Sequence, residues 1–311
     1  MTRAEGRLRV FPSRCPLRRT RPSPLSLRAG SEGFGETKFY RPSLRITPET
    51  RYTNPRTACT QRSIRLAVDS SLSPAVRDYI ARQPNLGWRR TIFNSVLRLV
   101  VRALIDFDVT GIENIPPRGP TILMMNHISA IDPGLCMAAV RRRHVVPMSK
   151  VENFRSPVWG PFLWWYGAYK VHRGVVDREA LMNSIALLKS GLMILIAPEG
   201  TRSPHGLQEP KDGMTYVATK ADAVILPAGL SGAQHFKHRF PRRTPVQLHF
   251  GRPFRFKTGG RARIPRDELS MMTRESMIQL ALAIRDPALR GAYADLPATS
   301  ETIEFVDPQA V

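Results

Sequence analysis

A histidine and an aspartate stand five positions apart, directly after a short apolar run. The run Thr121–Met125 is expected to be a strand, and the sequence NHISAIDP follows it. His127 would therefore leave a strand end, where α/β folds place their ligands. A loop of this length lets the Asp132 carboxylate reach His127 Nδ1, which leaves Nε2 free to act as a general base. The pair would then resemble a serine-protease triad whose hydroxyl comes from the substrate. The alternative is a helix-capping aspartate beside a solvated histidine, because Asp132 followed by Pro133 is a favourable helix start.

A second polar loop follows another expected strand. The apolar run LMILIA leads into PEGTRS at 198–203. In this loop Gly200 permits close approach of the backbone, Thr201 donates a hydrogen bond and Arg202 binds bidentately, which suits a phosphate group. The sequences VHRG at 171–174 and LPAG at 226–229 also end short apolar runs. Four strand ends are thus expected to bring polar or turn residues to one edge of a sheet.

Apolar runs and helical patterns alternate through the middle of the chain. This alternation predicts an α/β domain with a central, mostly parallel sheet and helices on both faces. The C-terminal residues 266–311 are expected to form a helix around 267–284 and then a polar tail. The expected strands are 107–111, 121–125, 145–148, 192–197, 224–228 and 246–250, and the expected helices are 133–142, 177–189 and 212–220.

Two segments precede this domain, which we place at 108–265. Residues 1–72 are rich in Arg, Pro, Ser and Thr without periodicity, so we expect a disordered basic tail. An organelle transit peptide and a nucleic-acid-binding arm are the alternatives. Residues 73–107 include WRRTIFNSVLRLVVRALIDF, whose apolar residues recur at helical spacing and whose Arg98 and Arg102 share a face. The pattern is typical of an amphipathic, membrane-associating helix, with a core helix as the alternative.

The composition narrows the function class. The chain has 311 residues, 42% of them hydrophobic, and a formal net charge of +22. Such a charge favours anionic partners, whether nucleic acid, lipid headgroups or a phosphorylated substrate. The cysteines Cys15, Cys59 and Cys136 have no zinc or C-x-x-C spacing, so we expect an intracellular protein without a metal site. We find no uncharged apolar run of the roughly 18–20 residues that span a bilayer, and we expect no secretory signal peptide.

Two further clusters leave alternatives open. Trp159, Trp164 and Trp165 lie close together with Phe and Tyr residues nearby. They would form a membrane-interface belt, an acyl-chain groove or an aromatic core helix. The basic run RRRH at 141–144 would meet anionic lipid or the phosphates of a carrier, or else end a helix in solvent.

Taken together, these segments resemble the glycerolipid acyltransferases of the 1-acylglycerol-3-phosphate acyltransferase type. NHISAID matches the family's His-x4-Asp block, HRG corresponds to its second block, APEGTRS to its third and ILPAGLSG to its fourth, in the same order and with fitting separations. The segment MSKVENFRSPVWGPFLWWYGAY also looks like the family's stretch between the first two blocks. The resemblance covers roughly residues 85–255. In one departure, the family often has Phe before a Lys-x-Gly after the third block, whereas Pro210 here precedes Lys211-Asp212-Gly213, a change that bears on the acceptor pocket.

The resemblance implies a single acyltransferase domain and a reaction. His127 would be the general base and Asp132 its orienter, in the direct transfer of a fatty acyl group from acyl-CoA or acyl-carrier protein to the free hydroxyl of a lysophospholipid. The favoured acceptor would be 1-acyl-glycerol 3-phosphate, which gives phosphatidic acid, and no cofactor would be needed. Glu199 would either contact the acceptor or hold Arg173 or Arg202 in place. The implied glycerophosphate site consists of Arg173, Glu199, Gly200, Thr201 and Arg202.

The resemblance also sets the alternatives. The enzyme would associate with membrane lipids at the cytoplasmic face, with organelle targeting by the tail left open. The four blocks serve enzymes that acylate glycerol 3-phosphate or other lysolipids equally well. Outside this class, the charge suggests a basic nucleic-acid-binding protein, which would cluster basic and aromatic residues on a recognition element. Here the charge is spread along the chain, so we expect no specific nucleic-acid partner.

Overall fold

The computed structural model describes residues 74–157, 159–172, 177–239, 241–261 and 263–311. The fold below belongs to the described residues of the unit Thr53–Val311. The predictions for residues 1–72, including the disordered tail, lie outside the described residues.

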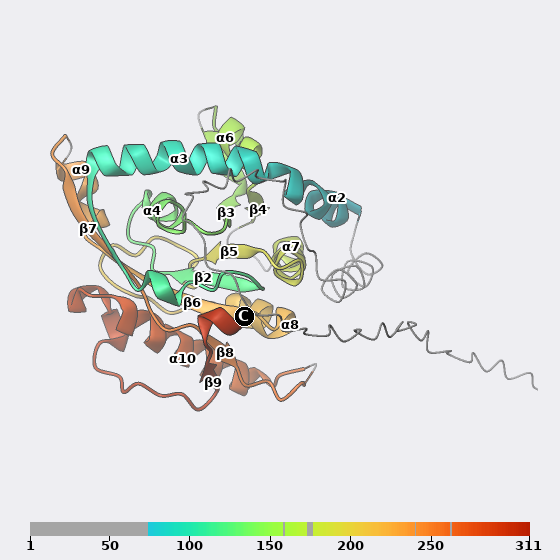
Figure 1. Ribbon diagram of the computed structural model, residues 1–311. Coiled ribbons are helices and arrows are strands. Elements are labelled where there is room, and N and C mark those ends of the chain that lie inside the picture. Colours follow the sequence, from blue (N-terminus) through green and yellow to red (C-terminus); the bar gives the residue numbers. More distant parts are fainter. Residues whose placement is uncertain (1–73, 158, 173–176, 240, 262) are drawn as a thin grey trace, which may run out of the picture. The chain divides into compact units, whose positions relative to one another are not determined.

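A nine-stranded sheet runs through the described part of the chain (Figure 1). Its main path has the order β1-β7-β6-β2-β5-β3-β4, and β8 and β9 extend it beside β6. The pairs between β2, β3, β4, β5 and β6 along this path are all parallel, whereas β6 pairs antiparallel with β7 and β8. The strands are β1 Ile105–Thr110, β2 Thr121–Met125, β3 Val145–Lys150, β4 Tyr169–Val171, β5 Met193–Ile196, β6 Val224–Ser231, β7 Thr244–Phe250, β8 Phe254–Phe256 and β9 Ile303–Phe305.

Helices cover both faces of the sheet. In Figure 1, α3 and α4 lie on one side and α8 and α10 on the other, with α10 packed against β6. Helix α7 packs against α8 and α2. The α-helices are α2 Pro74–Arg82, α3 Gly87–Leu104, α4 Asp132–Ala139, α5 Val151–Arg155, α6 Trp159–Tyr166, α7 Arg178–Lys189, α8 Gly213–Ala221, α9 Phe236–Arg239 and α10 Arg266–Ala283.

Burial on both faces explains the composition of the central strands. Every residue of β2, TILMM, and of β5, MILI, is buried. A strand covered on both sides needs a continuous apolar run rather than an alternating one. The predicted α/β class with a mostly parallel sheet flanked by helices is therefore confirmed.

Two predictions about the C-terminal half are wrong. The strand β6 continues to Ser231, so Pro227, Ala228 and Gly229 lie within a strand and not at its end. A side chain at Gly229 would come within 2.2 Å of the Ala283 carbonyl oxygen, so the glycine permits the close approach of α10. The expected polar C-terminal tail instead returns to the sheet, because β9 pairs antiparallel with β8. The alternating pattern of these short strands is too brief to be recognised from the sequence.

Helix α3 carries apolar side chains on part of its solvent face as well as on the face that packs into the core. Its buried residues include Arg90 and Asn94, whereas the stripe that faces solvent is apolar, with Leu99 69% exposed. A surface helix of a soluble domain normally has polar residues on its solvent face. The other exposed apolar side chains of this stripe are Trp88, Ile92, Val96 and Val100. Among the described helices, none is both long and apolar enough to cross a bilayer.

Candidate active site

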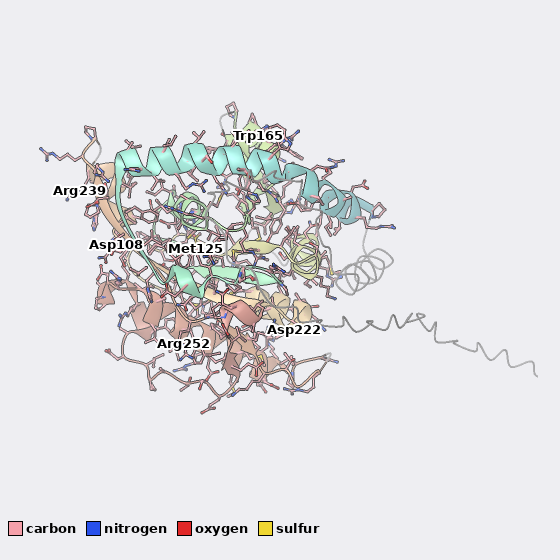
Figure 2. The ribbon with its side chains drawn as sticks, viewed as in Figure 1. Asp108, Met125, Trp165, Asp222, Arg239 and Arg252 are labelled. Atoms are coloured by element: carbon pink, nitrogen blue, oxygen red, sulfur yellow. The ribbon has the colours of Figure 1, made fainter. Side chains whose placement is uncertain are left out.

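His127 and Asp132 stand at the two ends of the loop between β2 and α4. The strand ends at Met125, which is labelled in Figure 2, and the helix begins at Asp132. His127 Nδ1 lies 2.9 Å from Asp132 Oδ2, which is the contact that the spacing predicted. Because an ionised carboxylate only accepts hydrogen bonds, the contact favours the tautomer with the proton on Nδ1 and a free lone pair on Nε2. The His127 side chain is 12% exposed, whereas Asp132 is fully buried.

The Asp132 carboxylate is turned back into the loop. Its Oδ2 also accepts from the backbone N–H groups of Ile128 at 2.7 Å and Ser129 at 2.6 Å. The expectation that Asp132 caps α4 is wrong, because Ile131 occupies the N-cap position and no side chain caps this helix. Burial raises the pKa of Asp132, and the three hydrogen bonds to Oδ2 oppose that rise because they favour the ionised form. These donors hold the carboxylate, and through it the imidazole, in one orientation.

Asn126 fixes the strand end from which His127 leaves. The side chain is buried, its Nδ2 donates to the Leu230 carbonyl at 2.9 Å, and its Oδ1 accepts from the Leu230 N–H at 2.7 Å. The last paired residues of β2 and β6 are Met125 and Ala228, so the Asn126 amide continues the link between these strands beyond the backbone ladder. The sequence analysis assigned Asn126 no role, because a single asparagine carries no spacing signal.

The loop at 198–203 is bonded to the backbone of His127. The Ser203 N–H donates to the His127 carbonyl at 2.6 Å, and Glu199 Oε1 accepts from the His127 N–H at 3.5 Å. The other oxygen, Oε2, accepts from the Gln208 N–H at 3.3 Å. Glu199 is buried, and burial raises its pKa. Glu199 thus connects the backbone of His127 to the backbone of Gln208.

A cleft of about 460 Å³ opens at this edge of the sheet, with His127 in its wall. The wall consists of residues at the ends of β2 to β5, of α7 and α8, and of one residue near the start of α10. Most of the lining is apolar, and a pocket of this kind with a few polar groups suits an acyl chain that ends at a reactive group. The large apolar residues of the lining include Met148, Leu181, Met214, Val217 and Leu269.

Only some residues of the predicted glycerophosphate site lie at the cleft or beside His127. Gly200 lines the cleft, and Glu199 lies beside the backbone of His127. Thr201 and Arg202 have exposed side chains and are not part of the cleft lining. Arg173 lies outside the described residues. The binding roles of these residues remain predictions.

A second His–Asp pair lines the same cleft and was missed by the sequence analysis. His172 Nδ1 lies 2.9 Å from Asp177 Oδ2, with the same spacing in sequence as His127 and Asp132. Asp177 Oδ1 also caps α7 by accepting from the Ala180 N–H at 3.0 Å. The hydrogen bonds from Ala180 and His172 outweigh partial burial and lower the pKa of Asp177. The His172 side chain is 63% exposed, so this pair lies at the open side of the cleft rather than against the buried loop.

Comparison with known proteins identifies the domain. Residues 106–231 match a family model described as Acyltransferase, and this range contains both the His127 loop and the loop at 198–203. This segment of the chain is therefore similar to the acyltransferase family. This match confirms the resemblance that the four blocks indicated, and all of the cleft lining except Leu269 falls within the matched range.

The similar proteins include acyltransferases of animals and bacteria. The 1-acyl-sn-glycerol-3-phosphate acyltransferase alpha of Ovis aries is 32% identical over 143 residues, which is 45% of this chain and 50% of that protein. The 1-acyl-sn-glycerol-3-phosphate acyltransferase of Borreliella burgdorferi is 33% identical over 135 residues, which is 42% of this chain and 54% of that protein. The chain thus spans about half the length of these relatives.

A solved structure is also similar to the chain. It is the crystal structure of the 1-acyl-sn-glycerophosphate (LPA) acyltransferase PlsC from Thermotoga maritima, with a TM-score of 0.47 and 22% sequence identity. The similarity covers 70% of this chain and 93% of that one.

Within the matched range, the basic run at 141–144 is partly structural. Arg141 and Arg142 are exposed, but Arg143 donates to the carbonyls of four loop residues and to the Thr121 hydroxyl. Burial lowers the pKa of Arg143 to about 10, so it stays charged at neutral pH. Arg143 therefore joins the loops before β2 and β5 instead of binding an external anion. The four carbonyls belong to Pro116, Arg118, Gly119 and Gly191.

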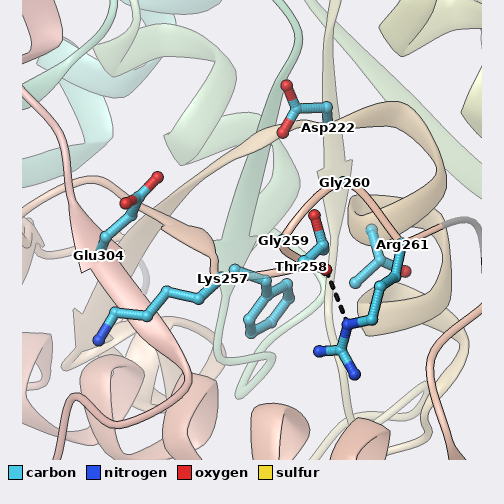
Figure 3. A pocket seen from close by; sticks show the side chains of 9 residues that line it. Asp222, Lys257, Thr258, Gly259, Gly260, Arg261 and Glu304 are labelled. Carbon is cyan, nitrogen blue, oxygen red and sulfur yellow. Dashed lines mark hydrogen bonds between the residues drawn. The ribbon is translucent and has the colours of Figure 1, made fainter.

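A second hollow is bordered by residues of α8, β8 and β9 and of the loops beside them (Figure 3). It has a volume of about 660 Å³ and is lined by residues before β6 and after β8, including Asp222 and Lys257. Its cations already have partners within the chain. Lys257 Nζ donates to the carbonyls of Ser300 and Glu301, and Arg261 forms a salt bridge with Glu268. We assign this hollow no ligand.

Proposed function

We propose that the protein transfers a fatty acyl group from acyl-CoA or acyl-carrier protein to the free hydroxyl of 1-acyl-glycerol 3-phosphate, which yields phosphatidic acid. The observation that carries the proposal is the imidazole of His127, oriented by buried Asp132, in the wall of an apolar cleft. The names of the relatives support this choice of acceptor.

The geometry supports a direct transfer. His127 Nε2 takes the proton of the acceptor hydroxyl while the hydroxyl oxygen attacks the thioester carbonyl carbon. The tetrahedral intermediate then collapses, the carbon–sulfur bond breaks, and the leaving thiolate takes the proton from His127. Asp132 stabilises the imidazolium between these two steps, because its carboxylate bonds Nδ1. This sequence of steps requires no covalent acyl-enzyme.

The apolar lining of the cleft supports substrates with long acyl chains. Each methylene group that leaves water contributes about 0.8 kcal/mol. Leu181, Met214 and Leu269 offer such contacts near the base. Binding energy from the remote chain can therefore hold the reacting carbonyl beside His127. Glycerol 3-phosphate, the alternative acceptor, lacks this chain and would depend on its phosphate alone.

The exposed apolar stripe of α3 supports attachment to a membrane surface. Helix α6 packs beside α3, with the Phe93 and Phe162 rings 4.2 Å apart, and it adds the exposed Trp159 and Trp164. Trp side chains favour the membrane–water interface, and the exposed Arg102 favours anionic headgroups. We infer that this surface lies on a bilayer, which delivers a lysolipid acceptor close to the domain.

Acyl transfer by the purified full chain tests the function. Wild type and His127→Ala are assayed with acyl-CoA and acyl-carrier protein against lysophosphatidic acid, lysophosphatidylcholine and glycerol 3-phosphate. We expect lysophosphatidic acid to be the best acceptor and His127→Ala to lose about 10²–10⁴ in kcat. The exposed His235 provides a matched control, and His235→Ala should behave as wild type. Wild-type turnover by a folded His127→Ala variant would overturn the mechanism.

Co-sedimentation with anionic vesicles tests the membrane surface. Leu99→Glu places a charge in the apolar stripe and should weaken vesicle binding. Part of the wild-type binding should survive high salt, because salt does not weaken apolar insertion. Leu282→Glu is the control, because Leu282 is also exposed but lies on α10 across the sheet. Equal vesicle binding by the two variants would contradict the assignment.

A further inference from the structure

Lys211 lines the cleft that contains His127, and none of the four blocks includes it. Its backbone N–H donates to the Pro198 carbonyl at 2.9 Å, which attaches it to the start of the loop at 198–203. The end of the same loop holds the His127 carbonyl through the Ser203 N–H. Lys211 is therefore tied to the base by a short path of backbone hydrogen bonds.

The Lys211 side chain lies over Gly200. Its Cδ and Cε atoms are 3.4 Å, and its Nζ atom 3.5 Å, from the point where a Cβ of residue 200 would stand. Gly200 also has a φ of +69°, which side chains rarely adopt. The glycine thus leaves room for the lysine stem and keeps the ammonium group beside the loop.

The charge of Lys211 has no carboxylate partner among the described residues. Among the described residues that line the cleft, it is the only lysine or arginine, and it forms no salt bridge with a described carboxylate. The two acidic residues of the lining have other partners. Asp177 accepts from His172 and Ala180, and Asp212 accepts from the Thr273 hydroxyl at 3.0 Å. An unpaired ammonium group at the mouth of a cleft attracts an anion.

We propose that Lys211 binds a phosphate group of a substrate at the mouth of the cleft. The proposal rests on the proposed function, because that reaction brings phosphate groups beside His127. One source is the phosphate monoester of the acceptor, and the other is the phosphates of acyl-CoA. Lys211 lines the cleft and Arg202 does not, so Lys211 is better placed to bind either phosphate.

Steady-state kinetics with matched substrates distinguish the two sources. Lys211→Met keeps the methylene stem over Gly200 and removes the charge, whereas Lys211→Arg keeps the charge. If the acceptor phosphate is bound, Lys211→Met raises the KM for lysophosphatidic acid roughly 10- to 100-fold and leaves that for monoacylglycerol unchanged. If the donor is bound, the KM rises for acyl-CoA and not for acyl-pantetheine. Lys211→Arg should recover most of the loss, and Lys220→Met, at the far end of α8, should have no effect.

Direct binding separates this proposal from the function itself. Titration calorimetry measures the binding of glycerol 3-phosphate and of CoA to wild type, Lys211→Met and Lys211→Arg. If wild type transfers no acyl group but binds one of these ligands in a Lys211-dependent way, the phosphate site stands and the proposed function fails. If wild type is active but Lys211→Met matches it in KM for every substrate and in ligand binding, the phosphate site is overturned and the function stands. Equal losses with phosphate-bearing and phosphate-free substrates also overturn it.

Discussion

Asn126→Ala should weaken both the fold and the reaction, because one buried amide connects the central strands to the base. The wild-type side chain satisfies both the N–H and the carbonyl of Leu230. Alanine leaves these two groups unpaired in the interior, next to β2 residues that are fully buried. The position of His127, which directly follows, then depends on the remaining contacts of its loop.

The magnitude follows from the number of groups left without partners. A buried peptide group without a hydrogen bond costs about 1–3 kcal/mol, so two cost about 2–6 kcal/mol of the free energy of unfolding. The effect on catalysis is separate, because a displacement of about 1 Å at the reacting groups can cost about 10²-fold in rate. We therefore expect a folded but less stable variant whose kcat is reduced at a temperature where it remains native.

Urea denaturation followed by circular dichroism, together with the acyl-transfer assay, checks this prediction. Asn114→Ala is the matched control, because within the described part of the chain Asn114 Nδ2 donates a single hydrogen bond, to the Phe250 carbonyl at 2.9 Å, away from the cleft. It should lose less stability and no activity. A stability loss below about 1 kcal/mol in Asn126→Ala would refute the account of the amide. An unchanged kcat in the folded variant would show that Asn126 holds the strand without positioning His127.

Three further predictions concern the base, the loops and the pH response. Asp132→Asn should keep the fold, since an amide oxygen can still accept from the N–H groups of Ile128 and Ser129. The variant should nevertheless lower kcat by about 10²–10⁴ in the transfer assay, because the charge that stabilises the imidazolium is lost. Arg143→Met should lower the free energy of unfolding by about 2–4 kcal/mol in urea denaturation, because four carbonyls and one hydroxyl lose their donor. Arg142 is exposed, so Arg142→Met should leave the free energy of unfolding nearly unchanged. Burial raises the pKa of Asp132, so kcat/KM should fall on acidification at a higher pH than an exposed aspartate would give. Because the pKa of Asp132 is raised in the folded state, protonation of Asp132 stabilises the fold as the pH falls. Hydrogen bonds lower the pKa of Glu275. The contribution of Glu275 to the free energy of unfolding is therefore lost only below the ordinary pKa near 4.5. Activity should therefore decline before the circular-dichroism signal, and a simultaneous decline would contradict this order.

Much of the scaffold of the site was predictable from the sequence. The apolar runs of β2 and β5 are continuous because both faces of these strands are buried, and such runs are the clearest sequence signal of a central parallel strand. The contact between His127 and Asp132 was predictable because the loop between them is short. The location of the candidate site at one edge of the sheet then followed from the topology, since parallel strands bring their carboxyl ends together.

The supporting contacts could not be predicted, because they join residues far apart in the chain. Asn126 bonds Leu230, and Ser203 bonds His127, through hydrogen bonds that no local pattern reveals. Arg143 looked like part of a solvated basic run because its partners are backbone carbonyls, which every sequence contains. The departure after the third block, Pro210 before Lys211, gave no indication that Lys211 would line the cleft.

The exposed apolar stripe of α3 lies on a helix that packs next to the His127–Asp132 loop. The helix packs against α4, and a side chain at Gly134 would stand 3.8 Å from Leu97 of α3. Gly134 is two residues beyond Asp132, which is the first residue of α4. Helix α3 therefore contacts the helix that begins at the residue that orients His127. The buried face of α3 is held by Arg90, which donates to the Tyr166 and Gly167 carbonyls. Hydrogen bonds from Arg90 and apolar core contacts thus fix this helix to the domain and leave its exposed stripe for the membrane surface that we propose, as a reaction with a lipid acceptor would require.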